Sequence, residues 1–390
     1  MRLFKKDFFV IDMHCHVGDT TLPDKIGQSG ANNPGVCKVY ESLEGLQKNV
    51  GWNGGVIGLN GTPKNYLNIM QKSGTDLSVF AMLSFSEELG GVELSSSEFL
   101  ATEVLAKYPR DKYLAYAGVD PRLPDKVKEK KIEYYVNNYG FTGIKLNPND
   151  WGTFPLNDPK VMAIYKKCNE LNVPIHIHTG VDPTGVIAYG NPLLLEEIAI
   201  KFPKLKLMLE HYGFPWKYEA YAMCRKYENV YLTLAWHFND LVHHNKFLAW
   251  QELEEMRIHA GIDKILYGSD FPASPNQKEV IDFLKYERVP LTMRRMGFHK
   301  WSHEMRAKVL GLNAAKVLGI SNEKIEKLNA RFTKKEEQVF TLEWSQDALQ
   351  VLDTIPGFIR KQAAKRIEIF AKEHKIKLVT PEVMQNARKA

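Results

Sequence analysis

The chain alternates short apolar runs with stretches in which apolar residues recur every three to four positions. The short runs are rich in valine, isoleucine and leucine, which is typical of strands buried in a parallel sheet, and the periodic stretches are typical of helices. Eight strands are predicted, at residues 8–14, 76–83, 113–119, 141–146, 173–178, 205–210, 229–235 and 263–268. In the helical stretches after the fourth and fifth strands, Asp158 and Asn191 are placed as caps, each followed by proline. Eight strands separated by helices predict an α/β fold, a (β/α)8 TIM barrel.

The pattern changes after residue 320. Residues 1–320 hold the predicted barrel, and residues 321–340 are charged and helical in pattern, which predicts a surface linker. Residues 341–390 contain two amphipathic stretches and a third that starts at Thr380 and Pro381, where threonine caps and proline takes the first turn. We therefore expect a small all-helical C-terminal domain.

A long insertion, residues 17–61, separates the first predicted strand from the first helix. It is glycine-rich and carries Trp52. Long loops at the functional face of a barrel often act as lids or specificity elements. The insertion is therefore expected to cover the substrate and to contribute Trp52 to its binding, with a peripheral subdomain or an oligomer contact as the alternative.

Charge and hydropathy exclude several classes of partner. The formal net charge is +6 and no run of five basic residues occurs, which argues against a nucleic-acid or anionic-membrane partner. The apolar run 8–11 is broken by Asp12, too early for a signal peptide, and no stretch approaches the roughly 20 apolar residues of a transmembrane helix. The four cysteines have no CxxC spacing, so a cytoplasmic protein without disulfides is expected.

Side chains of metal-binding type recur at the predicted carboxyl ends of the strands, where such a barrel carries its chemistry. They are His14 and His16 on the first strand, Lys145 on the fourth, His176 and His178 on the fifth, Glu210 and His211 on the sixth, and Asp270 on the eighth. Alternate residues of a strand share a face, so His14 and His16 would project side by side toward one ion. Because five of the chain's 12 histidines lie at the ends of the first, fifth and sixth strands, together with an acid on the eighth, the sequence predicts a metal site.

The motifs IDMHCH, HIHTG, LEHYG and YGSDFP, taken together and in this order, resemble the signature positions of the amidohydrolase superfamily. The resemblance is to the amidohydrolase-related branch that includes aminocarboxymuconate-semialdehyde decarboxylase and related benzoate-type decarboxylases and hydrolases. It covers residues 7–320 and continues in SHEMRAKVLGLNAAKVLGI, which looks like the closing helix of that branch. It implies a TIM barrel with a metal centre.

The resemblance also implies a role for five residues. The metal ligands would be His14, His16, His178 and Asp270, and His211 would be the histidine beside the catalytic water. One divalent ion is expected, with zinc as the first choice and manganese or another divalent ion as alternatives. Asp270 would accept a proton from metal-activated water, and His211 would act as general acid or base or stabilise charge on a substrate oxygen.

Each of three other polar residues has two interpretations. His176 shares a face with His178, so it is either a ligand or a hydrogen-bonding partner in the core. Lys145 either binds a substrate carboxylate or, as in some branches of the superfamily, becomes a carbamate that bridges two metals. Arg122 follows the third strand, where it would bind a carboxylate or phenolate or form a surface ion pair. Lys145, Arg122 and Trp52 are the candidate substrate-binding residues.

The C-terminal tail resembles the small helical module of light-independent protochlorophyllide reductase. The matching positions are Trp344, Ala348, Ile355, Pro356, Phe358, Arg360, Glu368, Ala371, Val379, Thr380 and Ala387. No cysteine follows Cys224, so the module cannot supply iron–sulfur ligands, and a packing or interaction role is favoured over tetrapyrrole chemistry.

The sequence therefore favours a metal-dependent hydrolase that acts with activated water on a small carboxylated or cyclic substrate. The close alternative is a metal-dependent non-oxidative decarboxylase, a lyase, acting on an aromatic or muconate-type acid, because both reactions use one set of residues. A different class is a binding or scaffold protein that docks to a redox or tetrapyrrole complex through residues 341–390. A homodimer is also expected, since relatives of the resembled branch often form dimers.

Overall fold

The computed structural model describes residues 8–18, 61–84, 93–148, 154–182, 185–274, 276–325, 341–353, 355 and 357–389. Nearly all of the insertion 17–61, with Trp52, lies outside these residues, as does the linker beyond residue 325. The predictions made for those two segments therefore stay predictions. The chain divides into two compact units, one formed by Val10–Gly319 and one that contains the chain from Ile320 onward.

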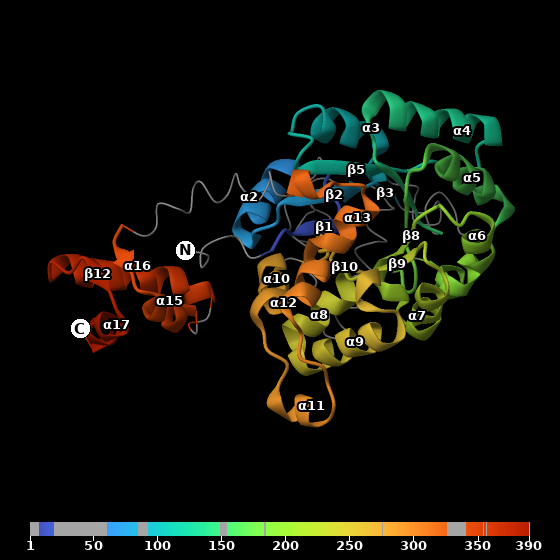
Figure 1. The fold of residues 1–390 in the computed structure, drawn as a ribbon. Helices are drawn as coiled ribbons and strands as arrows, with labels where there is room; N and C mark the ends of the chain where they lie inside the picture. The colour runs from blue at the N-terminus through green and yellow to red at the C-terminus, as the bar shows by residue number, and fades with distance from the viewer. Residues whose placement is uncertain are drawn as a thin grey trace, which may run out of the picture. The chain divides into compact units, whose positions relative to one another are not determined.

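Eight parallel strands form the sheet of the first unit (Figure 1). In sheet order they are β1 (Ile11–Cys15), β2 (Leu77–Ala81), β5 (Tyr113–Ala117), β6 (Gly143–Leu146), β7 (Ile175–Ile177), β8 (Leu207–Leu209), β9 (Val230–Thr233) and β10 (Ile265–Leu266). The sheet closes between its first and last strands, where Cys15 pairs with Phe271 and the amide of Met13 donates to the carbonyl of Tyr267 at 3.0 Å. This confirms the predicted TIM barrel, including all eight predicted strands.

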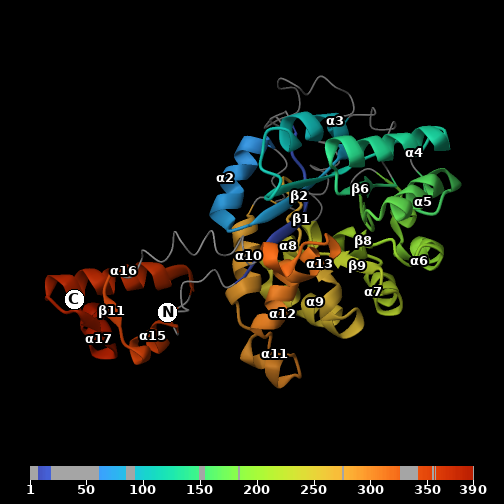
Figure 2. The same ribbon diagram turned by 45° about the horizontal axis from the view of Figure 1, so that its top comes forward.

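Helices surround this sheet (Figures 1 and 2). The longer ones are α2 (Pro63–Ser73), α4 (Asp125–Tyr134), α5 (Met162–Leu171), α6 (Glu196–Lys201), α7 (Lys217–Lys226), α8 (Trp236–His244), α9 (Lys246–His259) and α10 (Gln277–Tyr286). Both predicted caps form: the side chain of Asp158 accepts from the amide of Lys160 at 2.8 Å, and that of Asn191 accepts from Leu193 at 2.9 Å.

The closing segment of the barrel consists of α12 (His303–Ala307), the helical turn Lys308–Leu312 and α13 (Asn313–Val317). Asn313 anchors it, because its side-chain amide donates to the carbonyls of Ile262 and Ile265 at 2.8 and 2.9 Å. These contacts tie the segment directly to the start of β10. They give a physical reason for an asparagine at this point of the closing helix.

The second unit contains α15 (Gln346–Asp353), α16 (Gly357–Glu373) and α17 (Pro381–Lys389). Its own apolar core is formed by Ala348, Leu352, Ala364, Ile367, Ala371, Val379, Val383 and Met384. The predicted helical character is confirmed, with one addition: two short strands, β11 (Glu343–Trp344) and β12 (Leu378–Val379), pair in parallel. Two-residue strands leave no periodicity for sequence reasoning to detect. Among the described helices of the chain, none is both long enough and apolar enough to cross a bilayer.

Candidate metal centre

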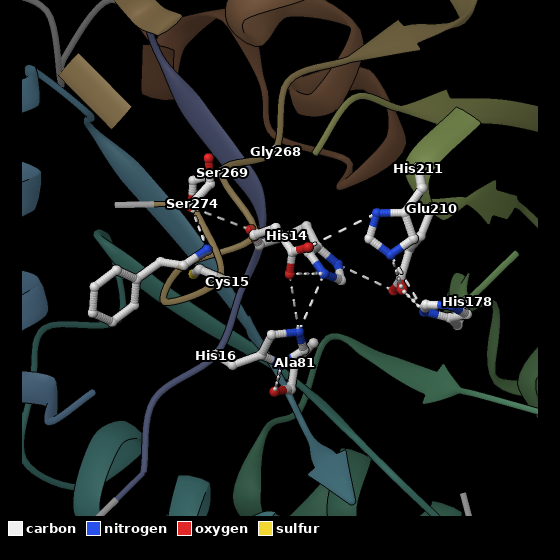
Figure 3. Close-up of polar contacts among 12 residues, drawn as sticks. His14, Cys15, His16, Ala81, His178, Glu210, His211, Gly268, Ser269 and Ser274 are labelled. Carbon is white, nitrogen blue, oxygen red and sulfur yellow. Dashed lines mark hydrogen bonds and ion pairs between the residues drawn. The ribbon is translucent and has the colours of Figure 1, made fainter. Parts of the chain in front are cut away.

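Six polar residues, one in β1 and five in the segments that directly follow β1, β7, β8 and β10, gather at the carboxyl ends of the barrel strands (Figure 3). They are His14, His16, His178, Glu210, His211 and Asp270, and each is at most 8% exposed. The strand pattern explains this, because alternate residues at a strand end turn toward the same side and the closed sheet brings β1 next to β10. Four of the five predicted site residues, together with Glu210, fall into two groups of three potential metal ligands.

The first group consists of His14, His16 and Asp270. His14 Nε2 lies 2.9 Å from Asp270 Oδ1 and 3.1 Å from His16 Nε2, and the remaining pair is 3.6 Å apart. A tetrahedral site with bonds of about 2.0–2.1 Å separates its donor atoms by about 3.3 Å. His16 Nδ1 lies 2.9 Å from the carbonyl of Ala81, where it donates and leaves Nε2 free to bind. These three atoms therefore fit one divalent ion.

The two ring nitrogens of His178 face different partners. Its Nε2 lies 3.1 Å from the carbonyl of Val181, and its Nδ1 lies 3.3 Å from His211 Nε2 and 3.4 Å from Glu210 Oε2. It belongs to neither three-residue group found among the described residues. Its role as a ligand stays a prediction, and Nδ1 is the nitrogen that faces the cluster.

His211 places a ring nitrogen toward the first group. Its Nδ1 is buried, has no hydrogen-bond partner in the described part of the chain, and lies 3.8 Å from Asp270 Oδ2. A buried polar atom is normally paired. An unpaired one aimed at a carboxylate of the candidate metal site is well placed to contact a bound water or a substrate oxygen.

The loops that carry these residues have unusual backbone geometry. His211, Tyr212 and Asp270 adopt φ values of 53°, 42° and 55°, a left-handed conformation that costs roughly 1–3 kcal/mol per residue and clusters at functional sites. Gly180, next but one to His178, has φ of +83°, and a Cβ there would lie 1.9 Å from the carbonyl oxygen of Phe214. Glycine therefore lets the loop after β7 pack on the loop after β8.

Asp12 links β1, which carries His14, to the segment after β10, which carries Asp270. Its Oδ1 accepts from the backbone amides of Ser269 at 2.8 Å and His14 at 3.2 Å, and its Oδ2 accepts from the hydroxyl of Tyr66 at 2.6 Å. Burial raises the pKa of Asp12 above its usual value. Sequence reasoning gave this residue no role, although the acid within the IDMHCH motif was the visible signal.

The electrostatics of the cluster keep its carboxylates ionised. Burial alone would raise the pKa of Asp270, but the nearby charge of His14 holds it well below its usual range. Burial alone would likewise lower the pKa of His14, yet Glu210 and Asp270 raise it to about 9. In the metal-free protein at neutral pH, His14 therefore carries a proton, which a bound cation would replace.

The imidazoles of His16 and His211 stay neutral. Burial lowers the pKa of His16 to about 3, assisted by the charge of His14, and burial lowers that of His211 to about 3, assisted by His178. Neutral imidazole is the form that binds a metal or accepts a proton. The electrostatics thus suit the ligand role predicted for His16 and, of the two roles predicted for His211, the stabilisation of charge on a substrate oxygen.

Glu210 was named from the sequence among the polar residues at the strand ends, but sequence reasoning gave it no role of its own. It is fully buried and forms an ion pair with Lys145, itself 2% exposed. Its oxygens also lie 3.1, 3.5 and 3.4 Å from the Nδ1 atoms of His14, His176 and His178. Burial alone would raise its pKa, but His14 and Lys145 hold it well below the usual range. The available signal was its position directly after β8, next to His211.

The remaining candidates lie in varied surroundings. Arg122 Nη2 pairs with Asp120 Oδ2 at 2.8 Å, and the arginine side chain is 39% exposed, so the surface ion pair named as its alternative is present. His176 Nε2 lies 3.0 Å from the hydroxyl of Thr233 and the residue is fully buried. The substrate-binding roles of Arg122 and Lys145 stay predictions, and Trp52 lies outside the described residues.

Solved structures with similar folds include enzymes of two kinds. A dihydroxybenzoic acid decarboxylase from Polaromonas, solved with manganese and 2-nitroresorcinol, is 16% identical with a TM-score of 0.52, covering 82% of this chain and 99% of its own. A Pseudomonas putida protein assigned as a 2-pyrone-4,6-dicarboxylic acid hydrolase is 14% identical with a TM-score of 0.50, covering 80% and 98%. At these identities the likeness establishes the fold.

The C-terminal unit has relatives of its own. Residues 344–388 match the family described as proto-chlorophyllide reductase 57 kD subunit. One component of the light-independent protochlorophyllide reductase of Tetradesmus obliquus is 35% identical over 78 residues, which is 19% of this chain and 15% of that protein. The chain thus spans about one seventh of the length of this curated relative, as expected from a shared module.

The barrel itself matches a family model over most of the chain. That model is described as amidohydrolase and covers residues 11–320, a span that includes every residue of the candidate metal centre. Solved neighbours with this fold include both a decarboxylase and a protein assigned as a hydrolase, and one of them holds manganese. The chain belongs to the amidohydrolase family.

Proposed function

We propose that this protein is a metal-dependent hydrolase that acts on a small carboxylated or cyclic substrate. The observation that carries the proposal is the convergence of His14 Nε2, His16 Nε2 and Asp270 Oδ1 within 2.9–3.6 Å of one another. The Nδ1 of His211, which has no hydrogen-bond partner among the described residues, faces them. A divalent ion bound there, such as zinc or manganese, would polarise a water molecule or a substrate carbonyl and lower the pKa of the water.

Two residues of the chain would handle the proton. Asp270 is ionised, because its pKa lies well below the usual range, and it can accept a proton from the attacking water. His211 is neutral, since its pKa is lowered to about 3. Its neutral ring can donate an N–H hydrogen bond to a developing oxyanion, while the proton that Asp270 accepts from the water is the one that passes on to the leaving group. Burial of both residues excludes competing water from these contacts.

A non-oxidative decarboxylase is the second candidate, supported by the likeness in fold to the Polaromonas dihydroxybenzoic acid decarboxylase. The same residues would then orient a carboxylated aromatic or muconate-type acid and protonate its ring carbon. A substrate carboxylate that approached Lys145 would compete with Glu210, which already forms an ion pair with this lysine.

A substrate panel separates the two reactions. The metal-loaded protein is incubated in ¹⁸O-water with lactones, cyclic amides and carboxylated aromatic acids, and both ¹⁸O incorporation and carbon dioxide release are measured. We expect ¹⁸O in the product without carbon dioxide, and loss of turnover in protein treated with a chelator. Carbon dioxide release without ¹⁸O incorporation would instead establish the decarboxylase.

Absence of turnover across the panel would favour the third class, a binding protein. Capture of a partner that required residues 341–390 would then support docking through the C-terminal unit. The buried cluster argues against this class, because a scaffold has no physical need for buried ionised carboxylates among imidazoles. We further propose a cytoplasmic homodimer, with dimer formation tested by light scattering.

A further inference from the structure

We propose that Glu210, held in place by Lys145, is a positioning residue that orients the His14 ring for metal binding. The inference rests on the metal-binding part of the proposed function, and it is independent of which reaction follows. It concerns the contact between His14 Nδ1 and Glu210, on the side of the ring that faces away from His16 and Asp270. The roles proposed above do not include this contact.

The two ring nitrogens of His14 face different partners. Nε2 points to His16 Nε2 and Asp270 Oδ1 at 3.1 and 2.9 Å, whereas Nδ1 lies 3.1 Å from Glu210 Oε1 (Figure 3). Neither Nδ1 nor Oε1 completes a hydrogen bond within the described part of the chain, and both atoms are buried. A small rotation of the ring, as expected when Nε2 binds an ion, would let Nδ1–H donate to the carboxylate and fix the tautomer.

The other candidate histidine ligand of this group is oriented in a comparable way. His16 Nδ1 lies 2.9 Å from the carbonyl of Ala81, which leaves Nε2 for the ion. Glu210 would give the Nδ1 of His14 a hydrogen-bond acceptor, as the Ala81 carbonyl does for the Nδ1 of His16. The difference is that Glu210 is a charged acceptor, which raises the basicity of the ring it contacts and so strengthens the metal bond.

Lys145 makes this arrangement possible inside the barrel. A fully buried carboxylate without a counter-ion is strongly disfavoured, and Lys145 Nζ contacts Glu210 Oε2, which leaves Oε1 directed at His14. Oε2 of Glu210 therefore pairs with Lys145, and Oε1 is the oxygen that faces His14. An ammonium engaged in this way is also unavailable for carboxylation, so the pair favours a centre with a single ion.

One alternative assigns Glu210 a direct bond to metal. His14, Glu210 and His211 form the second group of potential ligands, with atoms within 4.8 Å of one another. In that case Glu210 would use an oxygen for the ion and His14 would have to bind through Nδ1. The two arrangements differ in the number and type of atoms bound to metal, which spectroscopy can distinguish.

The test is a Co²⁺ titration of the metal-free full-length chain, followed through the visible absorption of the bound ion. Glu210→Gln keeps an acceptor oxygen but removes the charge, and Glu210→Ala removes both. We expect Kd for Co²⁺ to rise by about 10–100-fold in Glu210→Ala and by a smaller factor in Glu210→Gln, with the shape and intensity of the absorption band unchanged. Glu254→Gln, which removes a buried carboxylate paired with Arg257 at 2.8 Å, is the matched control and should leave Kd unaltered.

Each outcome bears on a different statement. Unchanged Kd in both Glu210 variants would overturn the positioning role, and an altered absorption band would assign Glu210 as a ligand instead. A wild-type chain that binds no Co²⁺ would overturn the metal-dependent function itself. If Glu210→Gln does not fold, the variant Lys145→Met with Glu210→Gln, which removes both buried charges, takes its place and should show the same increase in Kd.

Discussion

Replacing Lys145 with methionine is expected to lower the free energy of unfolding by about 3–5 kcal/mol, because the buried carboxylate of Glu210 loses its ammonium partner and keeps only its contacts with the nearby histidines. Glu210 is fully buried and Lys145 is its ion-pair partner. Methionine keeps most of the side-chain volume, so the loss reports on charge rather than on packing. Urea unfolding of the metal-free protein at neutral pH measures it.

Two comparisons make this result specific. The double variant Lys145→Met with Glu210→Gln carries no unpaired charge and should recover most of the lost stability. Lys107→Met breaks an exposed ion pair with Glu103, whose side chains are 56% and 42% exposed, and should cost less than about 1 kcal/mol. A loss at Lys145 no larger than that at Lys107 would contradict the account of a buried pair.

Replacing Asp270 with asparagine is expected to lower kcat by about 10²–10⁴-fold, the usual contribution of a positioned general base. Asparagine preserves the shape of the side chain but cannot accept the proton. It also lacks the charge that draws His14 Nε2 to 2.9 Å from Oδ1, so metal binding should weaken as well. The rate is therefore measured at saturating metal, on the substrate that the panel identifies, to separate proton transfer from metal occupancy.

Asp263→Asn is the control for this change, because Asp263 is 65% exposed and pairs with Lys308 at 2.9 Å on the surface. Its kcat should match that of the wild type. An Asp270→Asn variant that retained more than a tenth of the wild-type rate at saturating metal would show that another group accepts the proton.

Sequence reasoning reached the barrel and the ends of its strands for clear physical reasons. Buried parallel strands and amphipathic helices leave strong periodic signals, and the carboxyl ends of the strands must meet on one face of a closed barrel. His14, His16, His211 and Asp270 therefore needed no tertiary information to be grouped. Their separations of 2.9–3.8 Å follow from the closure between β1 and β10 and from the left-handed backbone of the loops.

Contacts across the barrel interior could not be predicted in the same way. Glu210 meets Lys145 from β6, two strands away in the sheet, and such a pairing depends on side-chain conformation rather than on spacing in the sequence. The same reason applies to His178, whose position at the end of β7 was predicted but whose ring turns its Nε2 to Val181. Register and periodicity identify which residues share a face, and not which atoms meet.

The most direct test of the metal centre is the metal content of the purified protein, determined by plasma mass spectrometry alongside His16→Ala. His16 Nε2 lies 3.1 Å from His14 Nε2 and 3.6 Å from Asp270 Oδ1, so its loss should empty the site without disturbing the strands. We expect about one divalent ion per chain in the wild type and a large loss of it in the variant. A folded wild-type chain that carries no metal, and takes up neither zinc nor manganese when they are added, would contradict the account.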